Sequence, residues 1–192
     1  MTLATTASTS GAPQHSALEH VWQLLESLTD PEIPVVTLRE LGILRDVRTA
    51  VAQDGTEQLE VVITPTYSGC PAMGQMVDDV TAALSGAGVS ARVVTQLAPA
   101  WSTDWMTAEA REKLRAYGIA PPAKSACAAS AGAQVITFTH RKSAGLVQAD
   151  TVACPQCGSS NTTEISHFGS TACKAMYRCL DCMEPFDYFK PY

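Results

Sequence analysis

The first run of apolar residues recurs at intervals of three and four, which predicts an amphipathic helix from residue 16 onward. The run follows Ser16-Ala-Leu-Glu19, a capping box whose polar side chains satisfy free N–H groups at a helix start. The helix should end near Thr29, because Asp30-Pro31 disfavours helical geometry. The next segment, Asp30-Pro-Glu-Ile-Pro34, is then expected to be a rigid acidic loop. The apolar positions of the helix are Leu18, Val21, Trp22, Leu25 and Leu28.

A β-hairpin and a crossover are predicted after this loop. Leu44–Val51 and Gln58–Thr64 have strand character and flank Asp54-Gly55, a dipeptide that favours a hairpin turn. The second strand is rich in apolar residues, which predicts a central place in its sheet. A helical pattern then runs from Met73 to Leu84, and Val89–Leu97 has strand character again. Strand, helix and strand together predict a right-handed parallel crossover.

A third helical pattern covers Thr107–Tyr117 and stops at Gly118, a residue type that commonly ends helices. With the elements before it, this helix predicts an α/β (α+β) fold for residues 16–119, a small mixed-sheet sandwich with helices. The residues that precede the domain, 1–15, contain no apolar run and are expected to be a disordered tail.

A linker and a second domain are expected after residue 119. Residues 120–150 begin with a stretch rich in Pro, Ala, Ser and Gly, which is typical of linkers. Within them, Gln134–His140 alternates enough to predict one strand, which could belong to either domain. Residues 151–192 have too few apolar side chains to close a hydrophobic core of their own. This last domain therefore needs another source of folding energy.

Four cysteines supply that source. They form two pairs, Cys154-x-x-Cys157 and Cys179-x-x-Cys182, and each pair makes a tight knuckle that directs two sulfurs at one tetrahedral centre. The spacing fits a zinc ribbon, in which a hairpin joins the knuckles. A structural zinc contributes about 10–16 kcal/mol of apparent binding energy, which becomes folding energy. The sequence therefore predicts a C-terminal zinc-ribbon domain, with iron or a transient iron–sulfur cluster as the alternative to zinc.

Composition and charge exclude several classes of protein. The chain has 46% hydrophobic residues and a net charge of −6, and its ribbon lacks the basic footprint that nucleic-acid binding requires. Residues 1–15 contain no lysine or arginine and do not resemble a signal peptide. No segment approaches the roughly 20 apolar residues that span a bilayer. We therefore expect a cytoplasmic protein, in which this cysteine distribution favours metal over disulfides.

Cys70 is the most reactive candidate outside the ribbon. Pro71 fits the first helical position, which places Cys70 at or beside the N-cap of the second helix. The positive end of a helix dipole favours a thiolate, so Cys70 could be a reactive or transient metal-binding sulfur. The alternative is a small residue that packs under the helix. Asp30 and Glu32 could bring two carboxylates near that turn, or they could belong to a solvated acidic loop.

The remaining candidates are open between two interpretations. Trp101, Trp105 and Met106 could form an aromatic docking patch or could close the sandwich over its core. Cys173 could be an alternative ligand or redox thiol, or an inert hairpin cysteine. His167 has no evident role. The sequence contains no nucleophile–base motif, phosphate loop or dinucleotide fingerprint, so we expect no independent enzymatic activity.

Two groups of motifs resemble known families. The first group resembles the small domain of iron–sulfur assembly factors of the SufT type. It comprises Asp-Pro-Glu-Ile-Pro-Val (30–35), Leu-Gly-Ile-Leu-Arg-Asp-Val (41–47) and Thr-Pro-Thr-Tyr-Ser-Gly-Cys-Pro-Ala (64–72). The second group is similar to the PaaD family, the D subunits of the bacterial phenylacetyl-CoA epoxidase (ring-1,2-epoxidase) system. It comprises Ala-Trp-Ser-Thr-Asp-Trp-Met (100–106), Phe-Gly-Ser-Thr-Ala-Cys-Lys-Ala (168–175) and Glu-Pro-Phe-Asp-Tyr-Phe-Lys (184–190).

The resemblance implies an accessory role in aerobic phenylacetate catabolism. It implies a maturation subunit that assists iron or iron–sulfur centre assembly in partner oxygenase or reductase subunits, or one that works with the iron–sulfur assembly machinery. The first alternative is a permanent structural subunit of the epoxidase complex, and the second is a rubredoxin-like electron carrier. Assembly into an oligomer stays open.

The resemblance also assigns roles to single residues. It implies that Cys70, Asp30 and Glu32 take part in metal or cluster transfer and that Cys173 matches an additional cysteine of the family. The family carries a further cysteine directly after its last Phe-Lys, where this chain has Pro191. The resemblance therefore does not carry over any role for that terminal sulfur, including pairing with Cys127.

Overall fold

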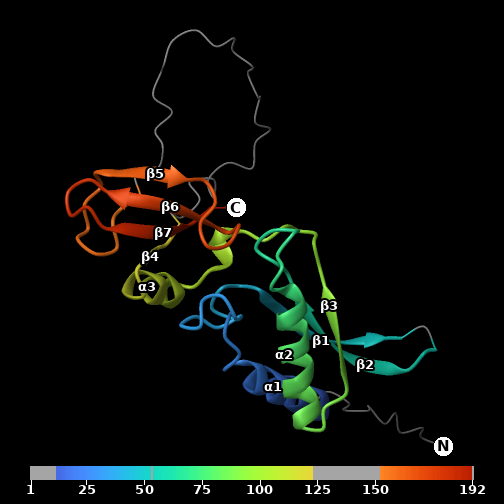
Figure 1. Ribbon diagram of the computed structural model, residues 1–192. Coiled ribbons are helices and arrows are strands. Elements are labelled where there is room, and N and C mark those ends of the chain that lie inside the picture. The colour runs from blue at the N-terminus through green and yellow to red at the C-terminus, as the bar shows by residue number, and fades with distance from the viewer. Residues whose placement is uncertain (1–11, 53, 123–151, 192) are drawn as a thin grey trace, which may run out of the picture. The chain divides into compact units, whose positions relative to one another are not determined.

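The computed structural model describes residues 12–52, 54–122 and 152–191 (Figure 1). The chain divides into two compact units, a first unit up to Trp101 and a second unit from Ser102 onward. Each unit has its own β-sheet. Within the part of the chain that the structure describes, no helix has the length and apolar character needed to cross a membrane.

The first unit is a three-stranded sheet with two helices. Its strands are in the order β1-β2-β3, and α1 contacts both α2 and β1 while α2 contacts β3 (Figure 1). The mixed α/β fold is confirmed. The elements are α1 (Ala12–Leu25), β1 (Leu44–Val51), β2 (Glu57–Ile63), α2 (Met73–Gly86) and β3 (Ala91–Thr95).

The hairpin and the crossover have the predicted topology. β1 pairs with β2 in antiparallel register, with Val47 opposite Val61. β2 pairs with β3 in parallel register, with Val61 opposite Val93. β2 is therefore the central strand, and three successive side chains of it are almost inaccessible because both faces of the sheet are covered there. These residues are Val61, Val62 and Ile63.

Both helices of the first unit differ from their predicted bounds. α1 begins at Ala12, so residues 12–15 belong to a helix and the expected tail is shorter. Pro13 lies in the first turn, where a missing N–H leaves no hydrogen bond unmade. The Ser16 capping box is therefore inside the helix. α1 also ends at Leu25 rather than near Thr29, and the Leu28 N–H donates to the Leu25 carbonyl at 3.2 Å in a tighter turn.

The second unit is a four-stranded sheet with a helix at one edge. Its strands are in the order β4-β7-β6-β5, and α3 contacts β4 (Figure 1). The elements are η1 (Thr103–Trp105), α3 (Ala108–Ala116), β4 (Ile119–Ala120), β5 (Thr162–Ser166), β6 (Lys174–Cys179) and β7 (Pro185–Phe189). The third helix agrees with its prediction. The Thr107 hydroxyl caps it by accepting from the Ala110 N–H at 3.1 Å, and Gly118 follows with a φ of 91°.

The division between the units differs from the boundary that the sequence predicted after residue 119. β4 pairs in parallel with β7, so Ile119 lies opposite Asp187 and Ala120 lies opposite Tyr188. Ala120 is therefore a strand residue of the second sheet rather than the start of a linker. The strand predicted at Gln134–His140 and the residue Cys127 lie outside the described residues.

The core of the second unit contains two of the sulfurs that were predicted as metal ligands. These sulfurs belong to one buried cluster of that core, and Tyr177 packs against this cluster. Its buried members are Ala120, Val152, Cys154, Ala175, Cys179, Phe186 and Tyr188. Cys154 and Cys179 therefore belong both to the hydrophobic packing of this unit and to the cysteine cluster.

Candidate metal centre and the Cys70 turn

Four cysteine sulfurs of the second unit converge on one point. The Sγ atoms of Cys154, Cys157, Cys179 and Cys182 all lie within 4.8 Å of one another. Across the two knuckles, the Cys154 and Cys182 sulfurs are 3.8 Å apart and the Cys157 and Cys179 sulfurs are 3.6 Å apart. A tetrahedral zinc with Zn–S bonds of about 2.3 Å separates its ligands by about 3.8 Å. The spacing fits a four-coordinate ion.

The two knuckles have the same backbone turn. Gly158 and Met183, which directly follow the second cysteine of each pair, have φ values of 76° and 67°. In the first knuckle the Cys154 N–H donates to the Ser159 carbonyl at 2.8 Å. In the second, the Cys179 N–H donates to the Glu184 carbonyl at 3.0 Å. These bonds position the sulfurs through the backbone.

Asp181 joins the two knuckles through side-chain hydrogen bonds. Its carboxylate accepts from the Ser159 hydroxyl and from the Asn161 amide, the latter at 2.7 Å. The Ser159 bond, and then the Asn161 bond, hold the pKa of Asp181 below its usual value. The Leu180 N–H also donates to the Asn161 carbonyl at 2.8 Å. Nothing in the spacing of the sequence indicated this bridge between the knuckles.

The donor set favours a soft cation. Thiolate is the form of cysteine that binds metal, and the main-chain N–H of Cys182 donates to the Cys179 sulfur at 3.5 Å. Four sulfurs in a tetrahedron are typical of zinc or of iron, and they do not suit magnesium or calcium. All four positions around the ion are filled by protein sulfur, so the site has the closed form of a structural centre.

Cys70 lies outside the helix that was expected to activate it. α2 begins at Met73 with Ala72 as its N-cap, so Cys70 lies two residues before the N-cap rather than at or beside it, as was predicted. The Cys70 carbonyl accepts from the Met73 N–H at 3.3 Å, and the Cys70 N–H donates to the Tyr67 carbonyl at 3.3 Å. Residues 67–73 therefore form successive turns that delay the start of the helix. Cys70 itself is half-buried.

Asp30 stabilises the acidic loop from within. Its Oδ1 accepts from the main-chain N–H groups of Glu32 at 2.8 Å and Ile33 at 2.9 Å. A bridge between Thr29 and Thr37 closes the loop. Asp30 is buried, whereas Glu32 is exposed, so the two carboxylates have different surroundings. An aspartate that accepts from main-chain N–H groups two and three residues later is typical of a turn, which agrees with a structural role for Asp30 in the loop. A transfer role for Asp30 and Glu32 stays a prediction.

The other candidates are placed by their contacts. Trp101 is buried and its indole N–H donates to the Leu41 carbonyl at 3.0 Å, so it closes the core of the first unit. Met106 is buried in the second unit, whereas Trp105 is half-buried, so Trp101 and Met106 do not form an exposed docking patch. Cys173 is not part of the four-sulfur cluster, and its Sγ lies 3.0 Å from the Thr171 hydroxyl.

Two family models match the chain. Residues 18–95 match the model described as iron–sulfur cluster assembly protein, and residues 139–190 match the model described as PaaD zinc beta ribbon domain. The fold and the four-sulfur site thus define an iron–sulfur-assembly-type α/β domain joined to a zinc β-ribbon. The chain is 47% identical over 174 residues to the Escherichia coli (strain K12) protein whose assigned name is the D subunit of 1,2-phenylacetyl-CoA epoxidase. That alignment covers 90% of this chain and 92% of the relative.

The chain therefore belongs to the PaaD family of phenylacetyl-CoA epoxidase subunits, and the resemblance seen in the sequence is confirmed. Solved structures are similar to part of it. A DUF59 domain of unknown function from Bacillus anthracis is 30% identical and has a TM-score of 0.45, covering 53% of this chain and 93% of that one. A Mycobacterium tuberculosis protein associated with Fe–S complex assembly and repair is 25% identical, with a TM-score of 0.32, covering 59% and 96%.

Proposed function

We propose that this chain is an accessory maturation subunit of the phenylacetyl-CoA epoxidase system, which assists iron or iron–sulfur centre assembly in partner subunits. The observation that carries the proposal is the combination of an iron–sulfur-assembly-type domain and a four-sulfur ribbon in one chain. The same chain is 47% identical to a protein named as an epoxidase subunit. Partner subunits supply the oxygenase chemistry, and this chain prepares their metal.

The ribbon holds a resident zinc in this proposal. Its four positions are occupied by protein sulfur, which leaves no open position for a substrate or for exchange with a partner. A single iron fits the same sulfurs, and in that case the chain would carry electrons as rubredoxin does. A colourless protein with one zinc per chain supports the structural zinc, whereas a coloured protein with one iron per chain supports the electron carrier.

The proposed transfer site is the Cys70 turn in the first unit. This turn follows the carboxyl end of β2, which is parallel to β3, and ligands of open α/β sheets bind outside such strand ends. Ser68 and Gly69 in the turn are exposed. At the strand end, the Thr64 hydroxyl is buried without a hydrogen-bond partner among the described residues. Such an unpaired group is often found where a structure binds something else.

The metal or cluster is cargo in this scheme. The Cys70 thiol loses its proton when the sulfur binds the cargo, because thiolate is the form that binds metal. A ligand from the partner subunit then replaces the Cys70 sulfur on the metal, and the sulfur takes up a proton again. No electron is transferred in either step, so no oxidant or reductant is needed.

Cys70→Ser tests the proposal when the chain is co-expressed with the epoxidase subunits. The iron content of the purified oxygenase and its epoxidation rate should fall severalfold, while the zinc content and melting temperature of this chain stay unchanged. Cys173→Ser makes the same chemical change at another half-buried cysteine and should behave as the wild type. Normal iron content with Cys70→Ser would contradict the transfer role.

A permanent structural subunit is the second candidate, because the relative is named as a subunit. Such a subunit should co-purify with the oxygenase at fixed stoichiometry. An active, iron-loaded oxygenase that has been purified away from this chain would exclude it and would support the maturation role.

A further inference from the structure

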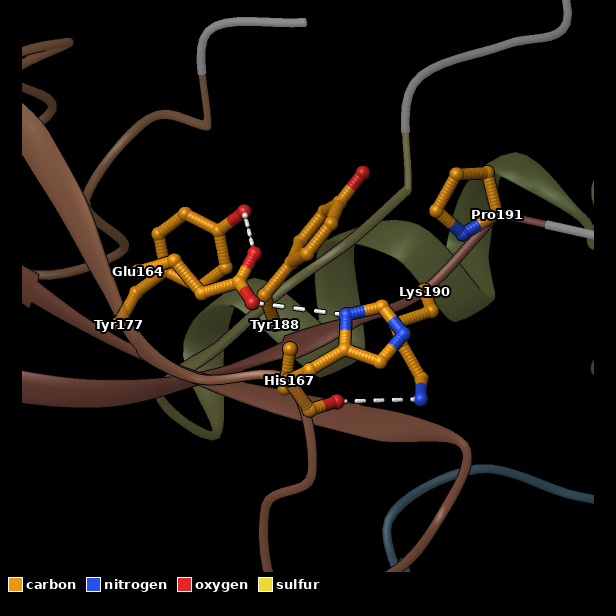
Figure 2. A pocket seen from close by; sticks show the side chains of 7 residues that line it. Glu164, His167, Tyr177, Tyr188, Lys190 and Pro191 are labelled. Carbon is orange, nitrogen blue, oxygen red and sulfur yellow. Dashed lines mark hydrogen bonds and ion pairs between the residues drawn. The ribbon is translucent and has the colours of Figure 1, made fainter. Parts of the chain in front are cut away.

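A pocket of about 280 Å³ lies on the sheet of the second unit, and none of the four cluster sulfurs lines it (Figure 2). Its volume is just below the range of about 300–1,000 Å³ that is typical of sites for drug-sized ligands. It therefore suits one ring rather than a nucleotide or a coenzyme. The lining residues are Glu164, His167, Ala175, Tyr177, Tyr188, Lys190 and Pro191.

The pocket exists because a small side chain interrupts a row of large ones. Ala175 of β6 lies opposite Tyr188 of β7, and Tyr177 follows on the same face of the sheet. The rings of Tyr177 and Tyr188 are 5.3 Å apart at an interplanar angle of 73°. Ala175 leaves unfilled the space between these rings and the end of β7. Two tyrosine rings thus line the pocket beside Ala175.

Polar contacts hold the walls in place. The Tyr177 hydroxyl donates to Glu164 Oε2 at 3.1 Å, and His167 Nδ1 lies 3.4 Å from Glu164 Oε1 (Figure 2). The Lys190 ammonium donates to the His167 carbonyl at 3.2 Å and lies 4.7 Å from the centre of the Phe168 ring. Each charged side chain of the pocket therefore has a partner before any ligand arrives.

The charges of the pocket select for a neutral ligand. Glu164 and Lys190 carry opposite charges, so with histidine neutral the lining has no net charge. A ligand that carries one charge would be attracted by one of these ions and repelled by the other, and it would lose its hydration on entering the pocket, so a neutral ligand is favoured. Aromatic walls favour the edge or face of another ring over an aliphatic group of the same size.

We propose that this pocket binds one neutral, planar aromatic ring of the size of phenol or indole. The ring packs over Ala175 against Tyr177 and Tyr188. Two sources supply such a ring, a free small aromatic molecule or a tyrosine or tryptophan side chain of another protein. This binding goes beyond the maturation function and does not depend on it.

Nuclear magnetic resonance of the full-length, zinc-loaded chain tests the proposal. Phenol and indole should give saturable shifts and intermolecular contacts to the rings of Tyr177 and Tyr188. Cyclohexanol should bind at least tenfold more weakly because its ring is not aromatic, and benzoate and benzylammonium should do so because they are charged. A blocked Gly-Gly-Trp-Gly-Gly peptide separates the two sources. If it displaces indole, the pocket accepts a ring presented by a protein, and if it does not, the ligand is a free molecule.

Two variants locate the binding. Ala175→Leu fills the pocket and should weaken indole binding at least tenfold. If leucine prevents folding, the smaller Ala175→Val change fills part of the pocket and should still weaken binding. Met176→Leu alters the next residue of β6, on the opposite face of the strand, and should bind indole as the wild type does. The absence of saturable shifts, or equal binding of cyclohexanol or of the charged probes, would overturn the proposal.

Discussion

Met183 has a backbone conformation that is normally occupied by glycine. Its φ is 67°, whereas the equivalent residue of the first knuckle, Gly158, has a φ of 76°. A side chain in this left-handed region costs roughly 1–2 kcal/mol. The second knuckle therefore folds against a local cost that the first knuckle does not have.

Met183→Gly should stabilise the zinc-loaded protein by about 0.5–1 kcal/mol, because relief of the backbone strain exceeds the extra freedom that glycine gives the unfolded chain. The Met183 side chain is 57% exposed, so its removal loses little packing. Chemical denaturation of the second unit measures the change. Met183→Ala keeps a Cβ and should gain nothing. A Met183→Gly variant that unfolds more easily than the wild type would show that this account of the knuckle is wrong.

Gly169 is constrained by contacts rather than by its φ. A Cβ there would lie 2.8 Å from Asp187 Oδ1 and 3.4 Å from the main-chain carbon of Lys174. Asp187 also accepts from the Ser170 hydroxyl at 3.2 Å and lies 3.5 Å from the Lys174 ammonium. Because Lys174 is buried, moving Asp187 would leave an ammonium group without its counter-ion.

Gly169→Ala should therefore destabilise the protein by roughly 1–3 kcal/mol, the cost of a buried polar group that loses its partner. Denaturant midpoints measure this loss. Gly74→Ala is the matched control, because a Cβ at Gly74 in α2 meets nothing within 4 Å. That control should gain about 0.5–1 kcal/mol, since alanine favours a helix more than glycine does. Equal effects of the two substitutions would rule out the close contact as the cause.

At the scale of elements, the β1–β2 hairpin is stabilised by its turn. The Asp54 carboxylate accepts from the Thr56 hydroxyl at 2.6 Å and from the Thr56 N–H at 3.0 Å. The hydroxyl bond, and then the main-chain bond, lower the pKa of Asp54 from its ordinary value of 3.8. Since the folded pKa is the lower one, this stabilisation is present above pH 3.8 and is lost as the pH falls through the folded value.

Titration of the Asp54 carboxyl by nuclear magnetic resonance should therefore give a pKa below 3.8. Thr56→Ala removes the larger of the two bonds, so the pKa of Asp54 should rise in that variant. Thr49→Ala alters another exposed threonine of the same hairpin and should leave the titration unchanged. An Asp54 pKa that is the same with and without the Thr56 hydroxyl would contradict the assignment.

Local signals explain which elements could be predicted. The hairpin and the crossover depend on Asp54-Gly55 and on an apolar strand, and these act on neighbouring residues. The start of α2 could not be predicted from Pro71, because the turns at Cys70 compete with the helix and delay it. β4 has two residues, and its partner β7 lies far along the chain, so no periodicity indicates it.

The candidate sites also differ in how far the sequence predicts them. The four ligand cysteines could be predicted because metal geometry fixes their spacing. Glu164 and His167 could not be assigned to a pocket, because a register shift between Glu164 and Ser166 breaks the alternation that would place their side chains on a face. The pocket also depends on the small side chain of Ala175, and an alanine in a strand gives no signal in the sequence that it borders a pocket.

At the scale of the whole molecule, the two units draw their stability from different sources. The first unit has a hydrophobic core that spans both helices and the second half of β2, with Val21, Met76 and Val61 among its buried side chains. The core of the second unit includes two of the ligand cysteines, Cys154 and Cys179. Removal of the ion should therefore weaken the hydrophobic core of the second unit as well as its metal site, and it should leave the first unit unaffected.

Chelation of the metal should consequently unfold the ribbon and leave the first unit folded. The lost binding energy, about 10–16 kcal/mol, is comparable to or larger than the whole stability of a typical domain, about 5–15 kcal/mol. Amide resonances of residues 152–191 should collapse to unfolded positions, those of residues 44–95 should persist, and added zinc should restore the first set. Cys179→Ser should reach the same state without chelator, because serine does not replace a thiolate ligand. Persistence of the ribbon resonances in the metal-free chain would mean that packing alone folds this domain, and the ion would then be available for a role other than folding.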